Sequence, residues 1–154
     1  MTDSEARGMP PAPHPSYRCR VGEADAALDQ RLSDELDRVN AEATRGTEPA
    51  RELTVSLHDD AGELAAGMSG WTWGVAAGIA MTWVRAGDRG AGLGARLLEE
   101  FEVEARRRGC QHVYVTSFTF QAPQFYVRHG YRELFRWEDV PVVGAADVHL
   151  RKDL

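Results

Sequence analysis

The chain is poor in the features that mark several protein classes. It has 2 cysteines among 154 residues, which is too few for a disulfide framework, and neither stands in a metal-ligand spacing. No hydrophobic run approaches the roughly 18 residues needed to cross a bilayer, and residues 1–16 lack the hydrophobic segment of a secretory signal. The formal net charge of −6 argues against a broad basic face for nucleic acid. We therefore expect a cytoplasmic protein without a metal site, a membrane segment or a nucleic-acid partner.

The rest of the composition is that of an ordinary globular domain. Hydrophobic residues make up 43% and charged residues 27% of a chain of 154 residues, which is long enough for one hydrophobic core. Residues 1–16 differ, because they are polar and carry four prolines between Pro10 and Pro15, which exclude a helix. The sequence predicts a disordered proline-rich tail at 1–16 and one folded domain at 17–154.

Hydrophobic periodicity predicts a mixed sheet flanked by helices. About seven strands are expected, at 17–21, 52–58, 63–71, 75–84, 112–118, 131–137 and 146–152. Three helices are expected: one after an N-cap at Asp25, one from Gly94 to Gly109, and one at 122–129. Hairpins join most strands, and only the helix after Gly94 creates a parallel pair. This order predicts an α+β fold.

A glycine-rich turn leads into the central helix. Gly90, Gly92 and Gly94 leave backbone N–H groups uncovered by side chains, and helical periodicity begins at Leu93. The first N–H groups of a helix have no intrahelical partner and lie at the positive end of its dipole. The stretch therefore predicts an anion site, to which Arg89 adds a charge. The alternative is a strand-to-helix turn that binds nothing.

The spacing of the glycines excludes two common phosphate-binding loops. A Walker loop requires a Gly-Lys pair, and the chain has none. A dinucleotide fingerprint requires G-x-G-x-x-G, whereas residues 90–94 read G-x-G-x-G. The stretch at 89–94 instead reads R-x-x-G-x-G, directly after a hydrophobic strand that ends at Trp83-Val84.

This R-x-x-G-x-G stretch resembles the acyl-CoA pyrophosphate loop of the GNAT acetyltransferases. A second GNAT pattern, A-x-x-[FL]-Y-x-x-x-G-[FY], is filled without a gap by Ala122, Phe125, Tyr126, Gly130 and Tyr131. The resemblance covers about residues 17–154 and is closest to small bacterial-type members whose helix reads F-Q-A-P-x-F-Y. One departure is Thr119, which stands where many relatives carry asparagine.

The resemblance implies an N-acetyltransferase that moves an acetyl group from acetyl-CoA to a primary amine of a small molecule or a peptide by direct attack. Neither cysteine lies in an activating motif, which disfavours an acyl-enzyme. In GNAT enzymes the pantetheine arm lies along the strand before the loop, and one N–H there polarises the thioester carbonyl, a role that falls to Val84. The expected cofactor-binding residues are Thr82, Trp83, Val84, Arg89, Gly90, Ala91, Gly92, Leu93, Gly94, Ala95 and Thr119.

The resemblance points to Tyr126 as the general acid. A phenol with an ordinary pKa of about 10 stays protonated at neutral pH and can donate as charge grows on the leaving sulfur. The alternative is a tyrosine that only packs beside Phe125. Nearby His129 fits a helix C-terminal cap better than an acid.

The general base is left open by the sequence. The strand at 75–84 has no carboxylate, so the glutamate that some relatives carry there is missing. Candidates are His112, Glu138, Asp139 and His149, and a water chain or an acceptor of low pKa is an alternative to all four. Trp71 and Trp73 share one face of an extended chain and either line an acceptor pocket or belong to the core.

Further alternatives concern partners. A non-catalytic CoA-binding or sensing domain would keep the anion loop without transfer, and an interaction module would bind no cofactor. The run Arg106-Arg107-Arg108 fits a helix C-terminus, and a minority interpretation gives one of these arginines to the phosphates of a cofactor. Exposed edge strands at the C-terminal end make a homodimer plausible.

Overall fold

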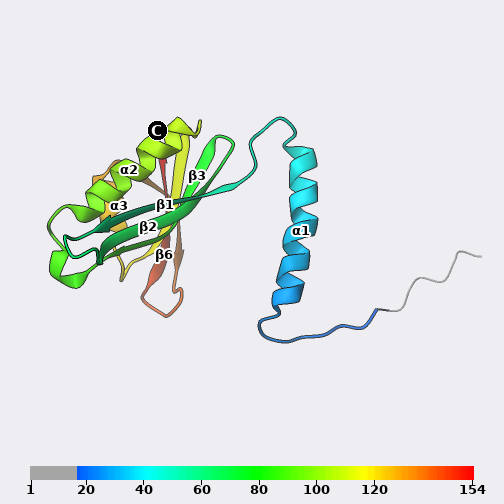
Figure 1. Cartoon of the computed structure of the whole chain (residues 1–154). Coiled ribbons are helices and arrows are strands. Elements are labelled where there is room, and N and C mark those ends of the chain that lie inside the picture. The colour runs from blue at the N-terminus through cyan, green and yellow to red at the C-terminus, as the bar shows by residue number, and fades with distance from the viewer. Residues whose placement is uncertain (1–16) are drawn as a thin grey trace, which may run out of the picture. The chain divides into compact units, whose positions relative to one another are not determined.

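The structure is a computed structural model that describes residues 17–154. The chain divides into two units, Met1–Ala43 and Thr44–Leu154, which are described separately (Figure 1). The tail predicted at 1–16 lies outside the described residues. None of the helices within residues 17–154 combines the length and the hydrophobicity that a membrane crossing requires.

The first unit contributes one helix, α1 (Ala26–Ala43). The Asp25 carboxylate caps it, because its Oδ1 accepts the backbone N–H groups of Ala27 at 3.1 Å and Leu28 at 3.0 Å. The N-cap predicted at Asp25 is therefore confirmed.

The second unit holds a six-stranded sheet in the order β1-β2-β3-β4-β6-β5. Its elements are β1 (Arg51–His58), β2 (Leu64–Trp73), β3 (Ala76–Val84), the 3₁₀ turn η1 (Ala86–Asp88), α2 (Leu93–Arg107), β4 (His112–Phe118), α3 (Pro123–Arg128), β5 (Arg132–Glu138) and β6 (Ala146–Asp153). Only β3 and β4 are parallel, and all other pairs are antiparallel. The α+β mixed sheet expected from the sequence is confirmed.

The expected count of about seven strands is wrong by one. Residues 17–21 form no strand, and their side chains are exposed. Alternating residues make a strand only where a neighbouring strand takes up their N–H and C=O groups. The described part of the first unit contains no such neighbour.

The core of the second unit lies between one face of the sheet and the helices α2 and α3. Leu97, Leu98 and Phe101 of α2 are fully buried against strand residues that include Val113 and Leu150. The two helices approach closely at Gly94, where an added Cβ would lie 3.3 Å from the Phe125 ring. This packing fixes the start of α2 beside α3.

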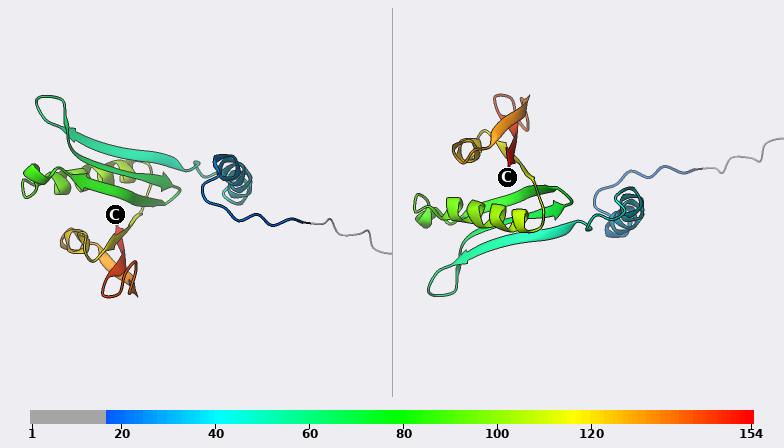
Figure 2. Two further views of the ribbon diagram at one scale, coloured as in Figure 1. Left: turned by 90° about the horizontal axis from the view of Figure 1, so that it is seen from below. Right: turned by 90° about the horizontal axis from the view of Figure 1, so that it is seen from above.

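The sheet opens between its two central strands. β3 pairs with β4 only from Ala76 opposite His112 to Ile79 opposite Val115, although each strand continues beyond that point. Figure 2 shows the two halves of the sheet diverging from there. A bulge in the β2–β3 ladder, where Ala80 has no partner, reverses the side-chain alternation of β3. Thr82 and Val84 therefore point to the helical face.

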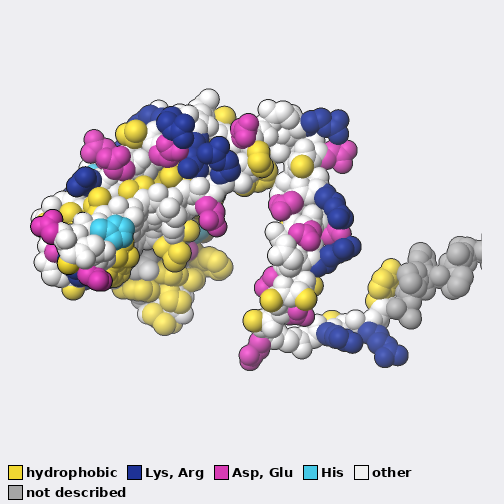
Figure 3. Space-filling model, viewed as in Figure 1, with side chains coloured by type: hydrophobic (Ala, Val, Ile, Leu, Met, Phe, Trp, Pro, Cys, Tyr) yellow, Lys and Arg dark blue, Asp and Glu magenta, His cyan; other side chains and the backbone are white. Residues whose placement is uncertain are grey.

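The edge strand β5 exposes hydrophobic side chains. Phe135 and Trp137 are more than half exposed, as are Val142 and Val143 in the loop to β6. Figure 3 shows hydrophobic side chains gathered at this end of the second unit. The homodimer and the cytoplasmic location both stay predictions. Cys19 and Cys110 are free thiols.

Candidate active site

A cavity of about 810 Å³ lies where β3 and β4 diverge. Four segments surround it: the second half of β3, the start of α2 with the loop before it, the end of β4, and α3 with its preceding turn. The lining residues are Ile79, Ala80, Met81, Thr82, Trp83, Val84, Arg89, Gly94, Val115, Thr116, Ser117, Phe120, Gln121, Ala122, Phe125, Tyr126 and Arg128. Thr82, Trp83, Val84, Arg89, Gly94 and Tyr126, which the sequence singled out, thus line one cavity.

The outer half of β3 presents backbone groups to this cavity. It pairs with β2 as far as Val84 but with β4 only as far as Ile79. The N–H and C=O groups on its β4-facing edge beyond Ile79 therefore have no strand partner. Residues 80–83 are exposed, so these backbone groups are open to an extended ligand with amide groups that can take the place of the missing strand.

The glycine loop presents a cluster of backbone donors. Gly90 and Gly92 have φ angles of +85° and +82°, which favour glycine, and no atom lies within 4 Å of the position that a Cβ would take at either residue. In this loop and the first turn of α2, five backbone N–H groups form no hydrogen bond with any residue of 17–154. They are those of Gly90, Gly92, Leu93, Gly94 and Ala95. These donors sit at the start of a 15-residue helix, where the dipole favours an anion.

Arg89 adds charge to this cluster. Its Nε donates to the Val84 carbonyl oxygen at 3.2 Å, which ties the loop to the end of β3. Within residues 17–154 the Arg89 guanidinium forms no ion pair with a carboxylate, and it lines the cavity. The residues present thus fit a phosphate or diphosphate group.

Tyr126 lies opposite the free edge of β3. Its hydroxyl donates to Thr82 Oγ1 at 3.1 Å, and the residue is 6% exposed. Burial raises the pKa of the phenol above its ordinary value, while the hydrogen bond with Thr82 lowers it. The phenol is therefore protonated at neutral pH and can donate a proton inside the cavity, as the expected acid must.

Thr119 lies just outside the cavity. Its hydroxyl oxygen accepts the Ala146 N–H at 3.0 Å, and its own N–H donates to the Ala146 carbonyl at 2.9 Å. Both groups thereby join the end of β4 to the start of β6. The structure does not bring Thr119 to the cavity wall, although its neighbour Phe120 lines it.

Three of the four base candidates are engaged in local contacts away from the cavity wall. His112 Nδ1 lies 2.8 Å from Asp153 Oδ1, and Asp139 Oδ1 accepts the Gly144 N–H at 2.9 Å within the β5–β6 loop. Glu138 lies 3.9 Å from the Arg136 Nε. None of the three lines the cavity.

His149, the fourth base candidate, lies nearer the opening of the sheet. It is the register partner of Thr116, which lines the cavity.

The two tryptophans considered for an acceptor pocket lie outside the cavity. Trp71 places its ring across the backbone of Gly78, and neither Trp71 nor Trp73 lines the cavity. Trp71 therefore covers β3 on the face opposite the helices.

Sequence reasoning missed part of the cavity wall. Arg128, in the last turn of α3, adds a second cation, and Gln121 accepts the Phe118 N–H at 3.0 Å to close the turn before α3. Arg128 could have been found, because it lies one helical turn beyond Phe125 in the recognised motif. Phe120 had no such signal, since its position depends on the turn.

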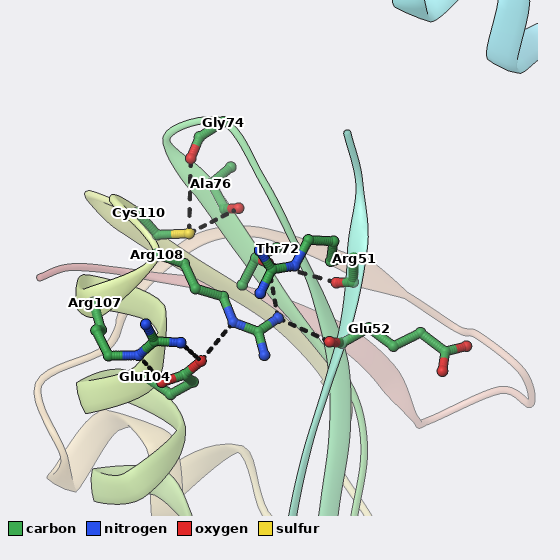
Figure 4. Close-up of polar contacts among 9 residues, drawn as sticks. All are labelled: Arg51, Glu52, Thr72, Gly74, Ala76, Glu104, Arg107, Arg108 and Cys110. Carbon is green, nitrogen blue, oxygen red and sulfur yellow. Dashed lines mark hydrogen bonds and ion pairs between the residues drawn. The ribbon is translucent and has the colours of Figure 1, made fainter. Parts of the chain in front are cut away.

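The other end of α2 forms a separate arginine cluster (Figure 4). Arg108 donates to Glu104 at 2.7 Å, to the Glu52 carbonyl at 2.8 Å and to Thr72 Oγ1 at 3.2 Å, while Arg107 makes two hydrogen bonds with Glu104. A smaller cavity of about 290 Å³ lies beside them. A 15-residue helix separates this cluster from the glycine loop by about 20 Å. Arg107 and Arg108 therefore lie far from the glycine loop, and the minority interpretation, which gave one arginine of the run to cofactor phosphates, stays a prediction.

Comparisons with known proteins agree with this geometry. Blasticidin-S acetyltransferase of Streptomyces morookaense is 45% identical over 84 residues, which are 52% of this chain and 60% of that relative. The chain thus spans less than two thirds of that relative's length. Acetyltransferase Atu2258 of Agrobacterium fabrum is 29% identical over 111 residues, 72% of this chain and 80% of the relative.

Structural similarity extends over most of the chain. The crystal structure of an acetyltransferase from Bacillus cereus has a TM-score of 0.77 and 28% identity, and the match covers 88% of this chain and 98% of that one. A family model described as the acetyltransferase (GNAT) domain matches residues 50–133, more than half of the sequence. The chain therefore belongs to the GNAT acetyltransferase family.

Proposed function

We propose that the protein transfers an acetyl group from acetyl-CoA to a primary amine of a small molecule, by direct attack of the amine on the thioester. The observation that carries this proposal is the cavity between β3 and β4. It joins a cluster of free amide donors, an unpaired strand edge and a protonated tyrosine. Those are the groups needed to hold a diphosphate, an amide-containing arm and a leaving thiolate.

Two segments hold the cosubstrate. The free N–H groups of Gly90, Gly92, Leu93, Gly94 and Ala95 bind the diphosphate together with the guanidinium of Arg89, whereas the Ala91 N–H donates to the Asp88 carbonyl at 3.3 Å. Arg128 lines the cavity and adds charge. The edge of β3 at Thr82 and Val84 aligns the pantetheine arm through its backbone groups, whereas the backbone of Trp83 pairs with Gly67 of β2. Thr119 contributes by fixing the turn that places Phe120 on the cavity wall.

The chemistry requires two polar groups near the thioester. The N–H of Val84 polarises the carbonyl as the amine nitrogen attacks it, because a fixed donor stabilises the developing oxyanion. Tyr126 then donates its hydroxyl proton to the departing thiolate sulfur. Because burial raises the pKa of this phenol, Tyr126 keeps its proton until negative charge develops on the sulfur as the bond to carbon breaks.

The acceptor belongs to the small-molecule amines. A relative that shares 45% identity over 84 residues is named for blasticidin S, which places blasticidin S first in a screen. The net charge of −6 favours a cationic acceptor through the long-range field. An amine panel of blasticidin S, aminoglycosides, polyamines, amino acids and peptide N-termini covers the main classes.

The test is release of free thiol from acetyl-CoA with each amine. With an active acceptor, Tyr126→Phe should lower kcat about 100-fold or more, because a positioned acid contributes about 10²–10⁴-fold. CoA affinity should stay within about twofold. Tyr131→Phe is the matched control, since it removes the hydroxyl of another buried tyrosine that does not line the cavity.

A different result would support the alternative. If CoA binds to the wild-type protein and no amine in the panel releases thiol, the protein is a CoA-binding or sensing domain of the same fold. Equal kcat values for Tyr126→Phe and the wild type would remove Tyr126 as the acid while leaving the transferase.

A further inference from the structure

The cavity is lined from both sides of the sheet. On the helical side its wall includes Tyr126 of α3 and, from β3, Thr82 and Val84. Met81 and Trp83 alternate with these two residues along β3 and therefore point to the side opposite the helices, yet they line the same cavity. Their exposed fractions are 70% and 48%. The cavity thus passes through the opening of the sheet and is accessible from the side opposite the helices.

Two phenylalanines at the end of β4 lie on this same side of the sheet. Val113, Val115 and Ser117 are buried toward the helices, so the alternation of β4 points Phe118 away from them. Phe120 stacks on Phe118, with 5.2 Å between ring centroids and 7° between ring planes. Phe120 also lines the cavity and is 63% exposed. Phe118 therefore supports one face of the Phe120 ring and leaves the other open to a ligand in the cavity.

Phe120 lies at the level of the expected thioester. The last residues that pair β3 with β4 are Ile79 and Val115. Val84, whose N–H we assign to the thioester carbonyl, comes five residues after Ile79, and Phe120 comes five residues after Val115. The turn that carries Phe120 is fixed to the start of β6 by the two hydrogen bonds of Thr119. A group that binds to the Phe120 ring can therefore hold an attached amine near the thioester.

The charges of the cavity wall restrict which group binds there. Among the described residues that line the cavity, Arg89 and Arg128 are the charged ones, and none is a carboxylate. A second ammonium group on the acceptor would meet these cations without a partner of opposite charge. An uncharged aromatic ring gains instead from offset stacking on Phe120, and Met81 offers a polarisable apolar surface. The wall therefore favours a flat, uncharged ring attached to a single amine.

We propose that Phe120, with Met81 and Trp83 across the opening, binds a planar aromatic ring of the acceptor. This inference rests on the proposed acetyl transfer and names its substrate class: primary amines joined by a short chain to an aromatic or heteroaromatic ring. The ring enters from the side opposite the helices and lies against the open face of Phe120. The amine reaches the thioester from there, while the diphosphate is held at the glycine loop on the helical side. Phe120 is thus a residue that determines specificity.

A matched pair of amines tests the role of the ring. Phenylethylamine and cyclohexylethylamine carry the same short chain and differ in whether the ring is aromatic and flat. We expect the wild type to have a kcat/KM about fivefold higher for phenylethylamine, because stacking of two aromatic rings stabilises a contact beyond the burial of its area. Phe120→Leu keeps a hydrophobic side chain without a ring, so the ratio of the two kcat/KM values should fall to about one.

Three controls make this result specific. Phe120→Tyr keeps the aromatic ring and should keep the ratio. Phe135→Leu changes another exposed phenylalanine on this side of the sheet, which does not line the cavity, and should keep both kcat/KM values. CoA affinity of Phe120→Leu, measured by calorimetry, should stay within about twofold of the wild type, because the ring is assigned to the acceptor.

The outcomes separate this inference from the proposed function. If the wild type acetylates amines but shows a ratio near one, or accepts neither member of the pair, the ring site is wrong and the transferase stands. The same follows if Phe120→Leu keeps the ratio. A loss of CoA affinity of tenfold or more in Phe120→Leu would assign the ring to the cosubstrate and overturn the inference. If no amine of the pair or the panel releases thiol with the wild type, both proposals fail.

Discussion

The two ends of α2 (Leu93–Arg107) are built in opposite ways. At its start the N-cap is Gly92, no side chain caps the helix, the first turn holds no acidic residue, and the N–H groups there lack partners. At its end Arg106 and Arg107 stand in the last turn. Gly109 N–H donates to the Arg106 carbonyl and Cys110 N–H to the Ala105 carbonyl, both at about 3 Å.

The start of α2 is thus suited to bind a ligand, whereas the end of α2 is bonded to neighbouring parts of the fold. A glycine N-cap such as Gly92 costs a helix only a few tenths of a kcal/mol relative to a capping side chain, and it leaves the N–H groups at the start of α2 free for an anion. At the end of α2 the arginines satisfy neighbouring carbonyl, hydroxyl and carboxylate groups, so they contribute to the fold. The predictions below separate binding at one end from stability at the other.

The largest effect is expected at the start of the helix. Arg89→Glu replaces the charge beside the donor cluster with one that repels a diphosphate, so CoA affinity should fall about 100-fold or more by calorimetry. The free energy of unfolding should change by less than about 0.5 kcal/mol, because Arg89 makes only one hydrogen bond, to a carbonyl. Arg132→Glu, an equal charge change at a side chain that is 61% exposed, should leave affinity unchanged.

A smaller effect of a different kind is expected at the end of the helix. Arg108→Ala removes the hydrogen bonds to Glu104, the Glu52 carbonyl and Thr72, and Thr72 is only 5% exposed. Leaving such groups unpaired should cost about 2–3 kcal/mol in urea denaturation. CoA affinity should not change, and a loss of affinity in a folded variant would refute the separation of the two ends.

The smallest effect appears only in acid. Hydrogen bonds from Arg107 and Arg108 lower the pKa of the Glu104 carboxyl from 4.5 to about 2. Because the folded pKa is below the unfolded one, this stabilisation is complete above pH 4.5 and is lost as the pH falls toward 2. The free energy of unfolding of Glu104→Gln should therefore fall less steeply with acid over this range than that of the wild type. Glu100→Gln, at an exposed residue of the same helix, should follow the wild type.

Most of the fold could be predicted from the sequence because its signals are local. Capping residues predicted a helix start after Asp25 and a helix end at Gly109, and periodicity predicted a strand at 112–118. The structure has all three features. The strand expected at 17–21 failed because alternation says nothing about whether a pairing partner exists.

The site could be predicted only where a motif fixes a backbone position. The anion loop came from its glycine spacing and Tyr126 from the GNAT resemblance, and the structure brings Arg89 and Gly94 of the loop to the same cavity as Tyr126. The position of Thr119 relative to the cavity could not be predicted from the sequence. Its hydroxyl oxygen accepts a hydrogen bond from the N–H of Ala146, which is 27 residues away in sequence. The position of His149 beside Thr116 depends on the register of β4 against β6, which no local pattern specifies.

The central claim is that free amides at the start of α2 bind the diphosphate of CoA, and backbone amide NMR tests it most directly. We predict that CoA shifts the N–H resonances of Gly90, Gly92, Leu93, Gly94 and Ala95, that pantetheine without the diphosphate leaves them in place, and that those of Arg107 and Arg108 respond to neither. CoA binding that leaves the five resonances unmoved, or no binding at all, would contradict the account.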